Sequence, residues 1–132
     1  MTRDTRQMAP AARLDHLLEA GSWRCAWCGY DLTKPNARPT RDHVVPKIKG
    51  GPTRLENEVA SCASCNRQRG HASPSQFIES SRRDRGLEPN AAHVADQLDA
   101  LIAAIERDGG MRKIRDYVAR EAKRVRQLAD EG

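Results

Sequence analysis

The sequence predicts a small α+β fold in which a compact, irregular middle segment lies between helices. Three leucines have helical spacing within residues 9–20, and Gly21 follows them as a stop signal. Glycine, proline, cysteine and short β-prone pieces replace helical periodicity over residues 22–71, and apolar residues return at helical spacing afterwards. These observations predict a leading helix, a non-helical core and a helical tail.

We divide the chain into an N-terminal helix (residues 1–21), a core (residues 22–72) and a helical extension (residues 73–132) within one compact domain. With 132 residues, 38% of them hydrophobic and five aromatic, the chain has little material for a large apolar core. A chain of this kind often depends on disulfides or a structural metal, and its four cysteines could supply either.

The cellular compartment distinguishes between these two roles of the cysteines. The first residues contain no apolar signal segment, and no run of about 18 apolar residues occurs, so we expect a cytoplasmic protein without membrane contact. The cysteines would then be reduced, and two C-x-x-C pairs in a reducing compartment indicate metal ligands.

The two C-x-x-C pairs predict a tetrahedral zinc site made by Cys25, Cys28, Cys62 and Cys65. Because all four ligands are protein atoms, this zinc is expected to be structural. The 33 residues between the pairs exceed the spacer of a simple zinc ribbon, so we infer a functional insert between them. Two alternatives are unrelated buried cysteines and a thiol redox protein that uses Cys25 and Cys28.

Some aromatic and histidine side chains are expected to have packing roles. Trp23 and Trp27 flank and divide the first cysteine pair, and we expect them to cover the zinc site rather than to stack on bases. His16 and His93 fall on predicted helices without ligand-like neighbours, so we interpret both as surface or packing residues.

The insert contains the side chains that phosphodiester hydrolysis needs. His43 can act as a base for water, and Asp42 and Asn66 offer hard oxygen ligands that suit magnesium. Three nearby arginines are candidate substrate-binding residues: Arg41, Arg67 and Arg69.

These residues, in this order, resemble the HNH endonuclease family. The family motif runs Asp-His, then a Gly-Gly turn, a central Asn, and Cys-x-x-Cys followed by His or Asn. Here the turn is Gly50-Gly51, the central Asn is Asn57, and Pro46 and Gly70 also agree. The resemblance covers about residues 25–70.

The resemblance implies a role for each matching residue. His43 corresponds to the general base, Asp42 and Asn66 to ligands of a catalytic divalent ion, and Asn57 to the residue that ties down the loop between the strands. It also implies a ββα-metal core, a two-strand hairpin followed by a helix that begins near Cys62. Products with a 5′-phosphate and a 3′-hydroxyl are expected.

The motif departs from the most familiar form because Asn66 occupies a position that is often His. An amide oxygen ligates hard cations better than soft ones, so we expect magnesium or manganese as the catalytic ion rather than zinc or nickel. His71 lies five residues after Asn66, about 1.4 turns along a helix, and is not expected on the same face.

The tail is predicted to contain a short helix at residues 74–83, a long helix at 90–107 and a second long helix at 111–129, with Ser73-Pro74 beginning the first. Asp108-Gly109-Gly110 separates the long helices, which predicts a helical hairpin. The apolar stripes are Val94, Leu98, Leu101, Ile102 and Ile105 in one helix, and Ile114, Val118, Val125 and Leu128 in the other.

The last helix is strongly basic. Against Asp116 and Glu121 it carries Arg112, Lys113, Arg115, Arg120, Lys123, Arg124 and Arg126. One hypothesis makes it an arm that contacts DNA phosphates, and the alternative is an ordinary solvated face. A second use of the hairpin is self-association into a homodimer, which would pair two active sites.

The residues and the resemblance together predict a metal-dependent endonuclease that acts on double-stranded DNA, by nicking or by double-strand cutting. The formal net charge of +5 suits a polyanionic partner. The alternative is a non-catalytic, zinc-stabilised module that binds nucleic acid in EDTA and never cleaves it.

Overall fold

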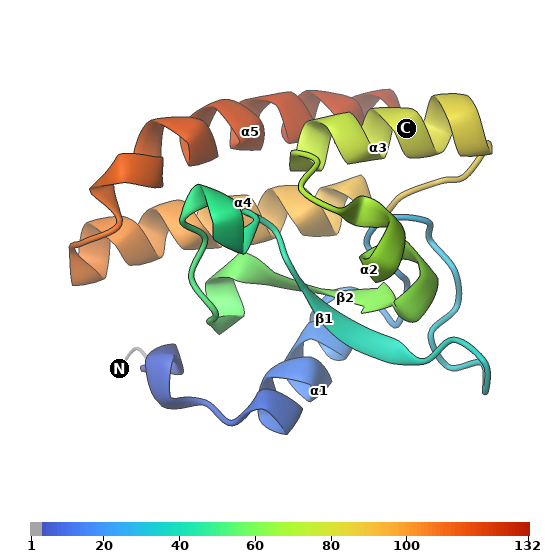
Figure 1. Cartoon of the computed structure of the whole chain (residues 1–132), viewed down its shortest axis with the longest axis horizontal. Helices are drawn as coiled ribbons and strands as arrows, with labels where there is room; N and C mark the ends of the chain where they lie inside the picture. Colours follow the sequence, from blue (N-terminus) through green and yellow to red (C-terminus); the bar gives the residue numbers. More distant parts are fainter. Residues whose placement is uncertain (1–3) are drawn as a thin grey trace.

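The computed structural model describes residues 4–132, and in these residues helices surround a two-stranded sheet (Figure 1). The elements are η1 (Thr5–Gln7), α1 (Pro10–Ala20), β1 (Pro39–His43), η2 (Lys47–Lys49), η3 (Leu55–Asn57), β2 (Glu58–Cys62), α2 (Ala63–Arg69), α3 (Pro74–Arg85), α4 (Ala91–Asp108) and α5 (Arg112–Glu131). The predicted α+β class is confirmed, and each helix expected from apolar spacing is present.

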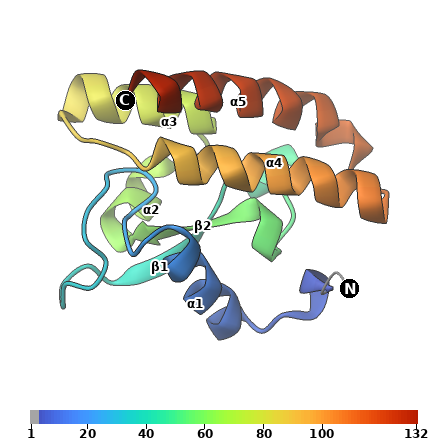
Figure 2. The same ribbon diagram turned by 180° about the vertical axis from the view of Figure 1, so that it is seen from behind.

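The helices cover the sheet from several directions. Helices α1 and α4 pack against β2, whereas α2 packs against both strands. Helices α4 and α5 form the predicted hairpin, and α3 lies beside α5 (Figures 1 and 2). No helix in the described part of the chain is both long and apolar enough to cross a membrane.

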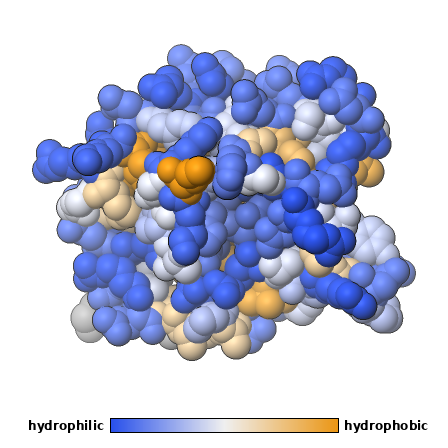
Figure 3. All heavy atoms as spheres, in the orientation of Figure 1, coloured by the Kyte–Doolittle hydropathy of each residue, from blue (hydrophilic) through white to orange (hydrophobic). Residues whose placement is uncertain are grey.

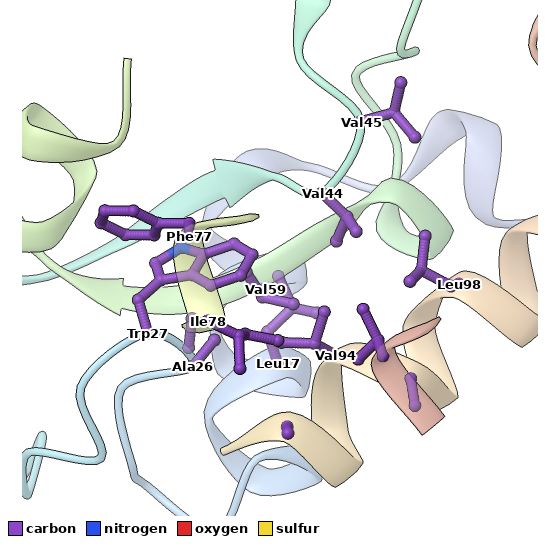
Figure 4. Packing of buried hydrophobic residues seen from close by; sticks show 14 of the residues in the cluster. Leu17, Ala26, Trp27, Val44, Val45, Val59, Phe77, Ile78, Val94 and Leu98 are labelled. Atoms are coloured by element: carbon purple, nitrogen blue, oxygen red, sulfur yellow. The ribbon is translucent and has the colours of Figure 1, made fainter. Parts of the chain in front are cut away.

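One apolar cluster joins all parts of the chain. Trp27 from the first cysteine turn, Val59 from β2 and Ile78 from α3 are fully buried and lie close together (Figure 4). The apolar stripes of α4 and α5 belong to the same cluster, with Ile102 and Leu128 at its edge. The tail therefore supplies much of the core that the short central segment could not build alone.

The two strands are antiparallel, with Asp42 opposite Val59 and His43 opposite Glu58. Their connection is longer than a tight Gly-Gly turn, because residues 44–57 include η2 and η3. Gly50 has a φ of 95°, and a Cβ on Gly51 would collide with the carbonyl oxygen of Val45. Both glycines are thus needed, within a wider loop than expected.

Short local signals begin and end the helices after β2. Cys62 caps α2 through its sulfur, and Gly70, with a φ of 57°, ends this helix after seven residues. Ser73 and Gln76 then form a reciprocal capping box that begins α3. Helix α2 is thereby held as a short element against the sheet.

Candidate active site and metal centre

The four cysteines expected to bind zinc lie in one cluster. Their sulfur atoms are all within 4.8 Å of one another, and those of Cys28 and Cys62 are 3.9 Å apart. A tetrahedron with Zn–S bonds of about 2.3 Å has sulfur atoms about 3.8 Å apart. The cluster therefore fits a structural zinc ion with four protein ligands and no open position.

Backbone donors around the cluster favour thiolate sulfur. The N–H groups of Trp27 and Cys62 donate to the sulfur of Cys25 over 3.4 Å and 3.3 Å. Together with the thiols of Cys28 and Cys65, they hold the pKa of Cys25 far below its ordinary value. The donated proton raises the pKa of Cys28 to about 12. The arrangement thus favours a Cys25 thiolate, the form of cysteine that binds metal.

Trp27 connects this cluster to the predicted catalytic residues. Its ring is fully buried and packs edge-on against Phe77, and its indole N–H donates to Oδ2 of Asp42 over 2.8 Å. Trp23, by contrast, is 37% exposed. The expected covering role therefore describes Trp27, which in addition fixes a carboxylate.

Asp42 has one oxygen held by the protein and one left free. Its Oδ2 accepts hydrogen bonds from Trp27 and, over 3.2 Å, from Arg69. Within residues 4–132 no hydrogen bond reaches Oδ1. Burial raises the pKa of the Asp42 carboxyl, and the charge of Arg69 opposes this shift. The free oxygen is a candidate ligand for a hard cation.

His43, at the end of β1, has an imidazole that is suited to accept a proton. Its Nε2 lies 2.7 Å from the hydroxyl of Thr53. When Nε2 donates to this hydroxyl, Nδ1 remains available as a base. Burial lowers the pKa of His43, which favours the neutral ring that a base requires.

Asn57 fixes the chain that follows His43. Its fully buried amide accepts from the N–H of Val45 over 2.9 Å and donates to the carbonyls of Val45 and Pro52. Its backbone carbonyl accepts from the N–H of Val44. The Asn57 side chain therefore links Val45 and Pro52 within the loop between the strands.

Asn66 projects from α2 onto β1. Its Nδ2 donates to the hydroxyl of Thr40 over 2.8 Å and to the carbonyl of Arg41 over 3.2 Å. Thr40 and Asp42 alternate along the strand and face the same side of it. The Oδ1 of Asn66 accepts no hydrogen bond in the described residues, but Asn66 does not line the hollow that Asp42 and His43 share.

A hollow of ≈ 180 Å³ gives access to this region from outside. It is lined by Asp42, His43, Pro46, Lys47, Ile48, Arg69, Gly70 and His71. His71 also lines this hollow, whereas Asn66 does not, because α2 ends at Arg69 and Gly70 turns the chain before His71. In the sequence, Gly70 is the one indication that the helix ends before His71.

The three arginines predicted to bind substrate have different environments. Arg41 pairs with the buried Glu58, and Arg67 is exposed. Arg69 departs from the expected phosphate contact, since its side chain is 1% exposed. It donates to Asp42 and to the carbonyls of His43, Val44 and Ala72, and covers the Trp27 ring. Arg69 therefore fixes the Asp42 carboxylate and the backbone at His43 and Val44.

Residues 25–81 match the family model described as HNH endonuclease. This segment, which is less than half of the chain, is similar to the HNH endonuclease family. It contains both cysteine pairs and every residue from Asp42 to Asn66, so the resemblance inferred from the motif is confirmed. The match supports a nuclease function. No curated protein matches the chain.

A solved structure shares the fold of the HNH segment and its flanking helices. The crystal structure of the Type II-C Cas9 enzyme from Actinomyces naeslundii matches with a TM-score of 0.50 and 18% sequence identity. The match covers 97% of this chain but 12% of that one. The similarity therefore concerns the fold of a small part of a much larger protein.

Proposed function

We propose that the chain is a metal-dependent endonuclease that hydrolyses DNA phosphodiester bonds in the hollow beside β1. His43 takes the proton from the attacking water, and Asp42 and Asn66 hold one divalent ion, magnesium or manganese. When bound, this ion would polarise the phosphate and stabilise the departing oxygen.

The observation that carries the proposal is the arrangement of Asp42 and His43 at the wall of the hollow. Within the described residues, each side chain has one polar atom fixed by a hydrogen bond and another that forms none. Trp27 and Arg69 fix the carboxylate, and Thr53 fixes the imidazole. A structural pair would be expected to have its polar atoms satisfied by the fold.

Cleavage of supercoiled plasmid with magnesium or manganese tests this proposal. Wild-type protein of verified zinc content should relax or linearise the plasmid, whereas His43→Ala should not. His16→Ala is a matched control, because His16 is exposed on α1. Retention of DNA without cleavage by the wild type would instead favour the zinc-stabilised binding module.

The ratio of nicked to linear plasmid among the products tests the homodimer expectation. The apolar residues Ile114, Val118 and Val125 of α5 are buried within this chain, so they offer no apolar surplus to a partner. One hollow in one chain is expected to nick, and paired hollows could cut both strands. We therefore expect mainly nicked circles from a monomeric preparation.

A further inference from the structure

A second, larger hollow lies beside the cysteine cluster and away from His43. Its volume is ≈ 520 Å³, within the range of small-molecule sites. It is lined by Cys28, Tyr30, Asn36, Ala37, Arg38, Cys62, Ala63, Ser64, Cys65, Arg67, Arg85 and Leu87. Nothing in the proposed cleavage reaction uses this cavity.

The charges in this cavity are of one sign. Its lining includes Arg38, Arg67 and Arg85 and no acidic residue. Arg85 contacts the sulfur of Cys65 over 3.4 Å, so it compensates the thiolates of the cluster. In the described part of the chain, Arg38 and Arg67 form no ion pair, whereas many other arginines, such as Arg54 and Arg126, are paired with carboxylates. Two arginines are therefore available for phosphate.

The cavity also presents an exposed aromatic ring. Tyr30 is 43% exposed, one of few large apolar side chains on the surface, and its hydroxyl donates to Oδ1 of Asn36 over 3.2 Å. This hydrogen bond fixes one edge of the ring and leaves a face for stacking. An aromatic ring beside unpaired arginines is the combination that binds single-stranded nucleic acid.

The cavity and the catalytic hollow lie at opposite ends of the same elements. Arg38 precedes β1, and Asp42 and His43 end it, which separates them by roughly 13–17 Å of extended strand. Arg67 lines the cavity, and Gly70, just beyond α2, lines the hollow. Because a DNA strand carries one phosphate per about 3.4 Å of helix axis, this separation corresponds to about four or five nucleotides.

We propose that this cavity binds one unstacked nucleotide of the substrate strand, a few nucleotides from the bond that is cleaved. Its base stacks on Tyr30, and its phosphates contact Arg38 and Arg67. The inference rests on the proposed nuclease function for its substrate. Since a base paired within a duplex cannot stack on Tyr30, a substrate with an unpaired flank is preferred.

Binding to two oligonucleotides tests the inference without cleavage. His43→Ala protein is compared with the same protein carrying Tyr30→Ala, using a fully paired duplex and a duplex with one unpaired flank. Tyr30→Ala should weaken binding of the unpaired flank by roughly 5- to 100-fold. Tyr30→Phe, which keeps the ring, should restore it. The double variant Arg38→Gln/Arg67→Gln should weaken binding more than Arg6→Gln, an exposed change near the N-terminus.

Photocrosslinking with 5-iodouracil in the unpaired flank supplies a second measurement. A crosslink to Tyr30 at one position of the series supports the site. Equal binding by Tyr30→Ala and the parent on both oligonucleotides, with no crosslink to Tyr30, would overturn it. If the wild type cleaves plasmid but Tyr30 does not crosslink, the inference fails and the nuclease stands. A crosslink to Tyr30 without any cleavage would support the nucleotide site and contradict the nuclease proposal.

Discussion

The cysteine cluster and the catalytic hollow are neighbouring regions whose polar atoms are used differently. In the cluster, four sulfur atoms face one another and receive backbone N–H groups, so the sulfur atoms are suited to hold a metal ion rather than to react with a substrate. In the hollow, Asp42 and His43 each retain an atom without a hydrogen bond from residues 4–132. The comparison suggests that the cluster stabilises the fold and that the hollow performs chemistry.

The two regions are nevertheless coupled through two buried side chains. Trp27 lies inside the first C-x-x-C pair and donates to Asp42, and Arg69 bridges Asp42 and the Trp27 ring. Loss of the cysteine cluster should therefore displace the Asp42 carboxylate. A substitution in the hollow, by contrast, should leave the cluster intact.

Removal of zinc should have the largest effect of any change. Structural zinc contributes about 10–16 kcal/mol to folding in small zinc domains, which exceeds the stability of most domains. We expect a strong zinc chelator to abolish the cooperative thermal transition seen by circular dichroism. Plasmid cleavage should be lost in parallel.

The same measurement on His43→Ala supplies the contrast. This variant should retain bound zinc and the thermal transition of the wild type while losing cleavage. A chelated wild type that still melts cooperatively would contradict the stabilising role of the cluster.

Substitutions of the two asparagines of the motif should differ in their effect on the free energy of unfolding and agree in their effect on cleavage. Asn57→Ala leaves two buried backbone groups of Val45 and the part-buried carbonyl of Pro52 without this partner, which should lower the free energy of unfolding by roughly 3–5 kcal/mol. Asn66→Ala removes half-buried hydrogen bonds to β1 and should cost about 1 kcal/mol. Both variants should lose cleavage, and urea unfolding measures the difference. Equal losses of stability would break the distinction.

The sequence predicted the parts of the site that depend on short-range spacing. The cysteine pairs, Asp42-His43 and the helix begun by Ser73-Pro74 each depend on residues close together in the chain. Spacing of this kind fixes local geometry directly, so the helices and the metal cluster could be anticipated.

Long-range contacts could not be anticipated in the same way. Arg69 was predicted to bind phosphate because an arginine after a motif gives no sign that its side chain will contact Trp27 and Asp42 in the folded protein. The cavity at Tyr30 also joins segments from the first loop, α2 and α3. Burial of a charged side chain is decided by which elements pack around it.

His93 offers a smaller, pH-dependent effect far from the metal sites. It is 4% exposed on α4, its Nε2 has no hydrogen-bond partner in the described residues, and burial lowers its pKa despite the nearby Asp96. The unfolded chain therefore binds a proton below about pH 6.5 that the folded chain does not. Stability should be fully present above this pH, should fall as the pH decreases from about 6.5 to the lowered pKa, and should level off below it.

The difference between variants isolates this contribution. The free energy of unfolding of His93→Leu should depend less on pH between 7 and 5 than that of the wild type, by about 1.4 kcal/mol for each unit of lowered pKa. His16→Gln, at an exposed position, should keep the wild-type dependence. Parallel curves for all three proteins would show that His93 does not titrate on unfolding.

The basic arm hypothesis should give the smallest effect, and the structure now supplies its control. Lys49 lies 5.2 Å from the ring of Tyr117, so the face of α5 that includes Lys113 and Arg120 lies next to the loop of the catalytic hollow. Neither residue forms an ion pair in the described chain, whereas Arg115 and Arg126 are paired with acidic residues of α4.

If this face contacts DNA, Lys113→Gln/Arg120→Gln should reduce the slope of log K against log salt by about 1.8, close to 0.9 for each lost phosphate contact. Arg115→Gln/Arg126→Gln changes the net charge equally but removes arginines already neutralised by α4, so its slope should change less. Binding titrations at several salt concentrations measure both slopes. Equal changes would mean that net charge alone attracts DNA, and an unchanged slope in the first variant would make this face of α5 an ordinary solvated surface.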